Sequence, residues 1–231
     1  MRYVISTLTL IYCLSSYANN PDQLWRFNVL TGDREIGTHT FRLTAQDGKQ
    51  HLSSEASFNV KVLFVNVFSY DHRSDEHWQG NCLERIESTT RANKKRFAVN
   101  GARKSEAFVV TNLTQTQELP SCVQTFAYWN PTILEANQLL NAQTGELESI
   151  NVSYTGQTSF KAYEQTYPAR QYRINLEKGY IDLWYHADSN VWLGLETMSP
   201  DKRIVRYVPE HTPQGQNEKM TNRQYLATES S

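Results

Sequence analysis

Residues 24–60 read LWRFNVLTGDREIGTHTFRLTAQDGKQHLSSEASFNV, and this stretch decides the fold class. Apolar residues recur in it at every second position, as at Trp25, Phe27 and Val29. Successive side chains of a strand point to opposite faces, so a period of two predicts half-buried strands and not helices. Turn-forming residues, including Asp47-Gly48, divide the stretch into strands that pair as hairpins, namely 24–30, 35–43 and 50–60.

The same pattern continues along most of the chain. Further short strands are predicted at 82–90, 95–99, 106–111, 149–154, 159–163, 170–176, 180–186, 191–196 and 203–208. Asn100-Gly101 is a strong hairpin signal between two of them. Only one region has helical spacing, where Asn130 can cap and Pro131 suits a first helical turn. The sequence thus predicts an all-β domain with one short helix at about 131–140, built as a strongly curved antiparallel sheet or a flattened, half-open β-barrel.

One run, VKVLFVNVF at 60–68, departs from the alternation because it is apolar on both faces apart from Lys61 and Asn66. An ordinary strand at the surface has one polar face. We therefore expect strand 60–68 to be covered on both sides by this chain, or to turn one side to an apolar ligand or partner. The polar residues 69–79 that follow would rim such a contact.

The N-terminus has the pattern of a secretory signal peptide. Arg2 precedes the uncharged, mostly apolar run 3–14, and the small residues Ser16 and Ala18 mark a cleavage site. The apolar run is shorter than the roughly 20 residues that a membrane span requires. We expect three parts: a signal peptide at 1–18, a single β-rich domain at 19–208 and a polar, disordered tail at 209–231.

Charge and cysteine content limit the partners. The chain has 23 Lys and Arg against 24 Asp and Glu, which is no footprint for nucleic acid or for an anionic membrane surface. We expect no transmembrane segment in the mature chain, since no later stretch is long and apolar enough.

Cys13 would leave with the signal peptide, and Cys82 and Cys122 would then form one structural disulfide. The alternative, a catalytic or metal-binding thiol pair, lacks a CxxC spacing.

The sequence contains no motif that identifies a chemistry. HExxH, GxSxG, a phosphate-binding loop and a dinucleotide-binding glycine pattern are all missing from it. His72 and His77 flank a charged cluster, but their odd separation places them on opposite faces of a strand, so we predict no metal site. Asp182 and His186 share a strand face and could support acid–base chemistry, although an exposed polar face explains them equally. We expect no cofactor and assign no catalytic residue.

Aromatic residues supply the candidate binding site. Segment 122–134, CVQTFAYWNPTIL, would be tied by the disulfide to the strand that begins at Cys82 and would cover the sheet as a lid. A curved sheet with such a cover makes an apolar pocket, although these side chains could equally be ordinary core. The predicted lining residues are Val62, Phe64, Val67, Phe126, Tyr128, Trp129 and Leu134.

Several blocks occur in a fixed order along residues 24–208. They are Ile36-Gly37 with His39 and Phe41, FNVKVLFVNVFSYDHRSDEHW (58–78), CVQTFAYWNP (122–131), LLNAQTGEL (139–147) and YIDLWYHADSNVWLGLE (180–196). In these blocks the chain resembles an uncharacterised family of exported Gram-negative bacterial proteins, a domain of unknown function. The resemblance implies a periplasmic protein and supplies no catalytic residues. At the level of architecture alone, the chain is similar to the half-barrel lipoprotein carriers of the Lol type.

Three functions follow as hypotheses. The first is a non-enzymatic periplasmic protein that binds a lipid or another hydrophobic ligand, with burial of each methylene contributing roughly 0.8 kcal/mol. The second is a protein-interaction module of the cell envelope that docks a partner through strand 60–68. The third is a hydrolase built on Asp182 and His186, which requires these groups to meet a nucleophile in a cleft.

Overall fold

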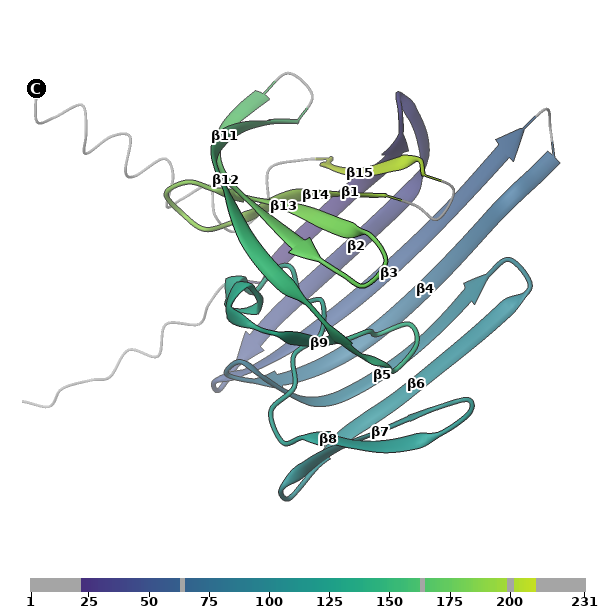
Figure 1. Cartoon of the computed structure of the whole chain (residues 1–231), viewed down its shortest axis with the longest axis vertical. Coiled ribbons are helices and arrows are strands. Elements are labelled where there is room, and N and C mark those ends of the chain that lie inside the picture. Colours follow the sequence, from purple (N-terminus) through teal and green to yellow (C-terminus); the bar gives the residue numbers. More distant parts are fainter. Residues whose placement is uncertain (1–21, 63–64, 163–164, 199–201, 211–231) are drawn as a thin grey trace, which may run out of the picture.

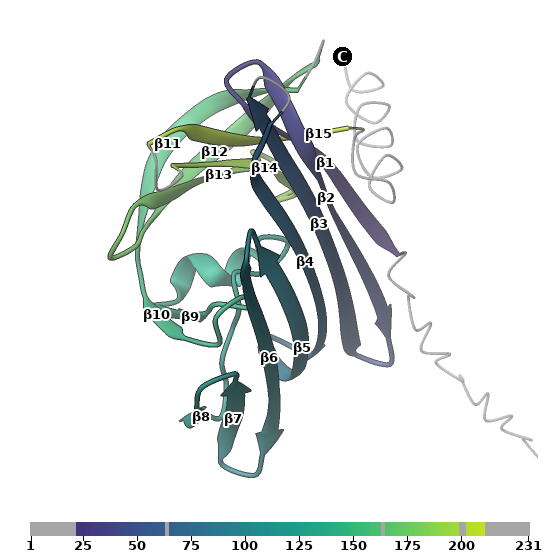
Figure 2. The same ribbon diagram turned by 90° about the vertical axis from the view of Figure 1, so that its right-hand side faces the viewer.

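The computed structural model describes residues 22–62, 65–162, 165–198 and 202–210, with only the backbone described at 61–62 and 65–67. The predicted signal peptide, Cys13 and residues 211–231 of the predicted tail lie outside these ranges. Within them the chain forms one antiparallel sheet of 13 strands and a second sheet of two strands that lies inside its curve (Figures 1 and 2). The prediction of an all-β fold with a strongly curved antiparallel sheet is confirmed.

The strands follow one another closely along the chain. Their bounds are β1 (Gln23–Thr31), β2 (Arg34–Gln46), β3 (Lys49–Val62), β4 (Val65–Gln79), β5 (Cys82–Ala92), β6 (Lys95–Lys104), β7 (Ala107–Asn112), β8 (Thr116–Pro120), β9 (Gln138–Leu140), β10 (Leu147–Ser149), β11 (Asn151–Ala162), β12 (Gln165–Asn175), β13 (Tyr180–His186), β14 (Trp192–Met198) and β15 (Ile204–Pro209). Among the described residues, the helical segment is the 3-10 helix η1 (Pro131–Glu135).

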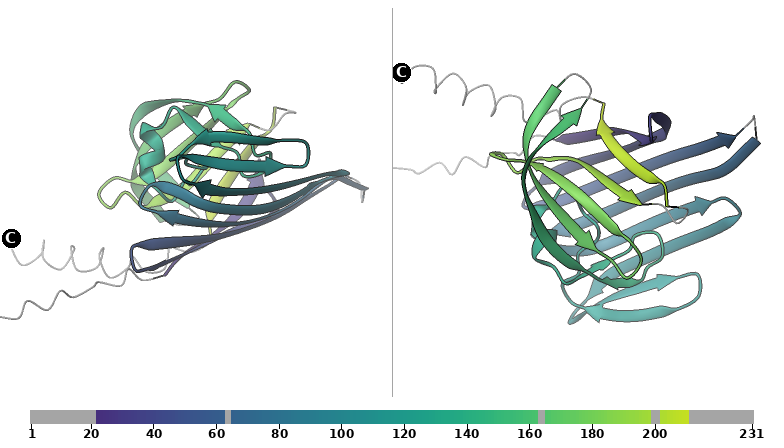
Figure 3. Two further views of the ribbon diagram at one scale, coloured as in Figure 1. Left: turned by 90° about the horizontal axis from the view of Figure 1, so that it is seen from below. Right: turned by 45° about the horizontal axis from the view of Figure 1, so that its top comes forward.

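Two meanders make up the large sheet. Strands β1 to β8 each pair with the next, and so do β11 to β15, while β15 pairs with β1 and joins the two series with Phe27 opposite Pro209. Strands β8 and β11 are the edges, and no pairing among the described residues joins them. The sheet therefore curls without closing, and its concave side holds β9, β10 and η1 (Figure 3).

The run 60–68 is not one strand. Strand β3 ends at Val62 and β4 begins at Val65, with Val60 opposite Phe68 and Val62 opposite Val65, so the run is the tip of a hairpin. The apolar residues of the run therefore belong to the ends of two neighbouring antiparallel strands. The prediction of a single strand at 60–68 that is apolar on both faces is therefore wrong, because the run belongs to two paired strands.

Two local predictions also need correction. Asn100-Gly101 lies inside β6, and the turn comes later, at Ser105-Glu106. A Cβ atom at Gly101 would lie 2.5 Å from Cε1 of Phe108, so this glycine allows the ring of β7 to pack against β6. The helix predicted at 131–140 is only the five-residue η1, because the chain after Ala136 extends into β9.

The core lies between the concave face and segment 121–149, which is called the inner segment below. Trp25 and Phe27 are buried there, as are Ile133 of η1 and Leu139 of β9. Cys82 and Cys122 form the predicted disulfide, with 4.8 Å between their Cα atoms, and it fastens the start of the inner segment to β5. The described residues contain no helix with the length and apolar character needed to cross a bilayer.

Candidate functional site

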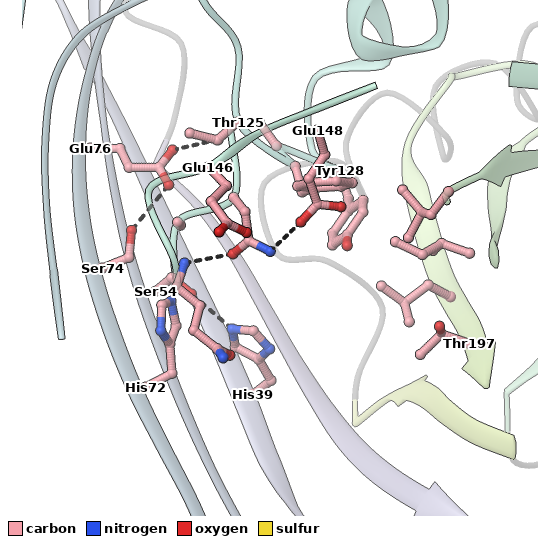
Figure 4. A pocket seen from close by; sticks show the side chains of 18 of the residues that line it. His39, Ser54, His72, Ser74, Glu76, Thr125, Tyr128, Glu146, Glu148 and Thr197 are labelled. Carbon is pink, nitrogen blue, oxygen red and sulfur yellow. Dashed lines mark hydrogen bonds between the residues drawn. The ribbon is translucent and has the colours of Figure 1, made fainter. Parts of the chain in front are cut away.

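A cavity of about 1090 Å³ separates the concave face of the sheet from the inner segment. This volume is at the upper end of the range for small-molecule sites. Three elements enclose it: strands β2 to β4 on one side, strands β13 to β15 on the other, and the inner segment across the top (Figure 4). The walls differ in chemistry, and this difference determines what the cavity can hold.

The wall formed by β2 to β4 combines six hydrogen-bonding side chains with the apolar Phe41 and Leu52. The six hydrogen-bonding residues, called the polar wall below, are His39, Ser54, Tyr70, His72, Ser74 and Glu76, and all of them except Tyr70 are labelled in Figure 4. All of them can donate or accept hydrogen bonds, and none is a permanent cation.

The two histidines of the polar wall are neutral at physiological pH. Burial lowers the pKa of His39 well below its usual 6.5, and the nearby His72 lowers it further. Burial also lowers the pKa of His72 to about 4. His39 hydrogen-bonds through Nε2 to Ser54 Oγ at 2.8 Å and through Nδ1 to the Tyr207 hydroxyl at 3.2 Å. His72 Nδ1 hydrogen-bonds to Thr90 Oγ1 at 2.8 Å.

Glu76 is the buried carboxyl of the polar wall, with 4% of its surface exposed. Burial raises its pKa to about 7, although three donors oppose this rise by stabilising the charged form. Ser74 Oγ donates to Oε1 at 3.0 Å, while Trp78 Nε1 at 3.1 Å and Thr125 Oγ1 at 3.0 Å donate to Oε2. The contact with Thr125 joins β4 to the inner segment (Figure 4).

The wall opposite combines three apolar side chains with Thr197 and with the charged Glu177 and Lys178. Ile181 of β13 and Leu195 of β14 line it, together with Leu176 at the turn that precedes β13. Thr197 also lies on this wall, and its hydroxyl donates to the carbonyl of Tyr180 at 2.7 Å (Figure 4). The cavity therefore offers apolar side chains from β13 and β14 on one side and a row of hydrogen-bonding groups, among them the titratable Glu76, on the other.

The inner segment is fixed to the sheet at many points, so the cavity is preformed. Next to the disulfide, the N–H of Leu83 donates to the carbonyl of Val123 at 2.9 Å. The hydroxyl of Tyr185 donates to the carbonyl of Tyr128 at 2.9 Å, and that of Tyr70 to Gln143 Oε1 at 3.0 Å. At the start of η1, Asn130 Oδ1 accepts from the N–H of Thr132 and caps the helix.

Three of the seven predicted lining residues line this cavity. They are Phe126, Tyr128 and Trp129, all from the inner segment. Leu134 is not among the lining residues and packs against the main core instead. The side chains of Val62, Phe64 and Val67 lie outside the described residues. The sequence thus indicated the aromatic cover, but it gave no signal for the polar wall, whose members come from three strands.

The residues considered for a hydrolase do not meet in this cavity. Both carboxylate oxygens of Asp182 are bound by Arg173, with Nε to Oδ1 and Nη2 to Oδ2 each at 2.7 Å. His186 Nδ1 accepts the backbone N–H groups of Asp188 at 3.3 Å and Ser189 at 3.4 Å, in the turn after β13. Neither residue lines the cavity, so the condition for that hypothesis is not met.

Ser54 and His39 have the spacing of a nucleophile and its base, and they do face the cavity. The third group of this arrangement is the hydroxyl of Tyr207, where hydrolases place a carboxylate that stabilises the imidazolium. The lowered pKa of His39 also makes the imidazole a weak base. The geometry therefore favours hydrogen bonding to a ligand over nucleophilic chemistry.

Metal-ligating side chains gather outside the cavity. Within the described ranges, His51, Asp75 and His77 are close enough together to hold one ion, and they lie on the face of the sheet opposite the polar wall. His72 and His77 are on opposite faces of β4, as the odd separation predicted. No pattern in the sequence indicates that His51 of β3 lies beside His77.

Comparison with known proteins assigns a family and a fold. The family model described as "Domain of unknown function (DUF6134)" matches residues 27–210. No curated protein matches the chain. A solved structure, described as the crystal structure of a beta-barrel-like protein of domain of unknown function DUF1849 from Brucella abortus, is similar with a TM-score of 0.60 and 10% identity. The match covers 81% of this chain and 95% of that one, and at this identity it shows the fold alone.

Proposed function

Because the chain belongs to the DUF6134 family, whose description assigns no activity, we propose from its geometry that it is a periplasmic, non-enzymatic carrier of a lipid-like molecule. The observation that carries this proposal is the cavity of about 1090 Å³, in which hydrogen-bonding side chains of the polar wall face the apolar side chains of Leu176, Ile181 and Leu195. An acyl chain would lie against Ile181 and Leu195, where its burial is favourable by roughly 0.8 kcal/mol per methylene. The polar part of the ligand would hydrogen-bond to the polar wall.

The charges around the cavity favour a ligand without a negative group. The charged residues that line it are four glutamates, Glu76, Glu146, Glu148 and Glu177, and one lysine, Lys178. With His39 and His72 neutral, these residues offer an anion little compensation. Burial of an unpaired anion is costly. We therefore expect an uncharged amphiphile, such as an acylated glycerol or the acylated end of a lipoprotein, to bind better than a free fatty acid.

Native mass spectrometry of protein purified from a bacterial periplasm, followed by organic extraction, tests the proposal. We expect an added mass that extracts as lipid. Titration with monopalmitoylglycerol and with palmitate then compares two ligands that share an acyl chain and differ in charge. We expect the glycerol ester to bind more tightly at pH 8, where carboxylates are ionised. An empty protein that binds neither compound would overturn the proposal, and one co-purifying envelope protein would support an interaction module instead.

A matched pair of variants ties any binding to this cavity. Ser54 and Ser53 are neighbours on β3 that point to opposite faces, and only Ser54 lines the cavity. Ser54→Phe fills space beside the polar wall and should weaken binding of monopalmitoylglycerol, whereas Ser53→Phe should leave it unchanged. Thr197→Phe makes the same test from the opposite wall in case the first variant folds poorly. Equal binding by all of these proteins would place the ligand elsewhere.

A further inference from the structure

A second site lies on the outer face of the sheet, independent of the cavity. His51 of β3 and His77 of β4 are direct cross-strand partners. Their rings are stacked, with centroids 4.6 Å apart and planes inclined by 13°. Asp75, two residues before His77, points to the same face of β4. Strands β3 and β4 are long, paired strands away from the edges of the sheet, which gives these three side chains a regular backbone to project from (Figure 1).

The donor atoms of the three residues converge. Asp75 Oδ2 lies 2.9 Å from His51 Nε2, and Asp75 Oδ1 lies 3.3 Å from His77 Nε2. One ligand atom from each residue can be chosen so that all three lie within 4.8 Å of one another. A tetrahedral ion binds nitrogen and oxygen ligands at about 2.0–2.2 Å, and small side-chain rotations bring these atoms to such distances.

We propose that His51, Asp75 and His77 bind one first-row divalent transition-metal ion, with Zn²⁺ as the simplest occupant. Imidazole nitrogens suit Zn²⁺, Cu²⁺ and Ni²⁺, whereas Mg²⁺ and Ca²⁺ prefer sites made of oxygen atoms alone. Three protein ligands leave a fourth position for water or for a group from a partner. The site goes beyond the carrier function and does not depend on it.

Neighbouring charges permit a cation at this place. Two arginines beside the cluster on the outer face each pair with a glutamate: Arg73 pairs with Glu55 at 2.6 Å, and Arg85, opposite His77, pairs with Glu87. Asp75 contacts the two histidines instead, so its negative charge lies where the ion would bind. The side chains of His51, Asp75 and His77 are 41%, 46% and 50% exposed, so an ion reaches them from solvent without any change in the fold.

Calorimetric titration of Zn²⁺ into the full-length gene product tests the proposal, using protein purified without a histidine tag and stripped with a chelator. We expect one Zn²⁺ per chain and little binding of Mg²⁺. Loss of a residue that only contacts a metal ligand already weakens metal binding roughly tenfold or more. Because His51 and His77 would be ligands themselves, His51→Ala and His77→Ala should each weaken Zn²⁺ binding by at least that factor. Affinity should also fall as the pH is lowered, because imidazole must be deprotonated to bind.

Matched controls separate the site from general surface binding. Asp71→Asn changes a carboxylate on the same face of β4, and His186→Gln changes a histidine away from the cluster, so both should keep the wild-type Zn²⁺ affinity. Zn²⁺ should also raise the midpoint of thermal unfolding of the wild type but not of the His51→Ala, His77→Ala double variant. Equal Zn²⁺ binding by the wild type and the double variant would overturn the proposal and leave the three side chains as a hydrogen-bonded surface group.

Discussion

Glu76 is the residue through which we expect pH to change the stability of this protein. Its pKa is raised from 4.5 to about 7 in the fold, chiefly by burial. Between these two values the folded chain keeps a proton that the unfolded chain has released. This group therefore contributes most to stability below about pH 4.5, and that contribution is lost as pH rises through about 7.

Replacement of Glu76 by glutamine removes this titration. A pKa shift of this size corresponds to about 3 kcal/mol. The wild type should lose about that much unfolding free energy between pH 4.5 and pH 8, and Glu76→Gln should not lose it. Urea unfolding at a series of pH values measures the difference in stability between the two proteins. The glutamine amide accepts less well from the three donors, which adds a constant offset, so only the change of this difference with pH tests the prediction. Glu118→Gln, at an exposed position of β8, is the control and should leave the profile close to that of wild type. Parallel pH profiles for wild type and Glu76→Gln would show that Glu76 is not the titrating group.

At the scale of single elements, sequence pattern predicted strands well and their pairing less well. The period of two placed Trp25, Phe27 and Val29 on the buried face, and all three are buried. The same pattern does not state which residues lie opposite one another, since register depends on turns. The prediction of a turn at Asn100-Gly101 was wrong. The glycine is required by the close approach of Phe108 and not by a hairpin. The pairing of His51 with His77 also depends on register, so the sequence pattern does not predict it.

The inner segment is the element whose form the sequence could least predict. Its aromatic residues and its disulfide were recognisable, but the predicted helix over 131–140 ends at Glu135, and residues 138–140 form β9 instead. Tertiary contacts decide this outcome. The carbonyl of Gln124 accepts from the N–H of Leu140 at 2.8 Å, and Thr125 forms a parallel bridge with Leu140. Such contacts between residues 15 or 16 positions apart override a weak local preference.

The disulfide between Cys82 and Cys122 should contribute substantially to stability. It closes a loop with a sequence separation of 40 residues and anchors the inner segment to β5. We expect the Cys82→Ser, Cys122→Ser double variant to lose about 2–4 kcal/mol in the free energy of unfolding. Urea unfolding measures the loss, and wild type kept under a reductant should behave in the same way. An unchanged midpoint in both cases would mean that hydrogen bonds such as Leu83 to Val123 already fix the segment.

At the scale of the whole molecule, the open curl of the sheet produces the cavity. Thirteen strands with β8 and β11 as edges enclose a volume too wide for the strands' own side chains to fill, and the inner segment occupies part of it. Composition and turn spacing predicted a curved sheet, but they could not say how far it curls or what it surrounds. Those properties depend on the β15 to β1 pairing, which joins residues about 180 positions apart, such as Phe27 and Pro209.

Export is the prediction that concerns the chain as a whole, and the disulfide gives it a physical basis. Disulfides persist in oxidising compartments, so a fold fastened by Cys82–Cys122 is suited to the periplasm. We expect the gene product, expressed in a Gram-negative host, to be recovered from the periplasm with an intact mass that begins at Asn19 and includes the disulfide. Ala18→Tyr should retain residues 1–18, because the peptidase requires a small residue there. Recovery of uncleaved wild-type chain with two free thiols from the cytoplasm would contradict the prediction, and it would also remove the periplasm as the setting for the proposed carrier.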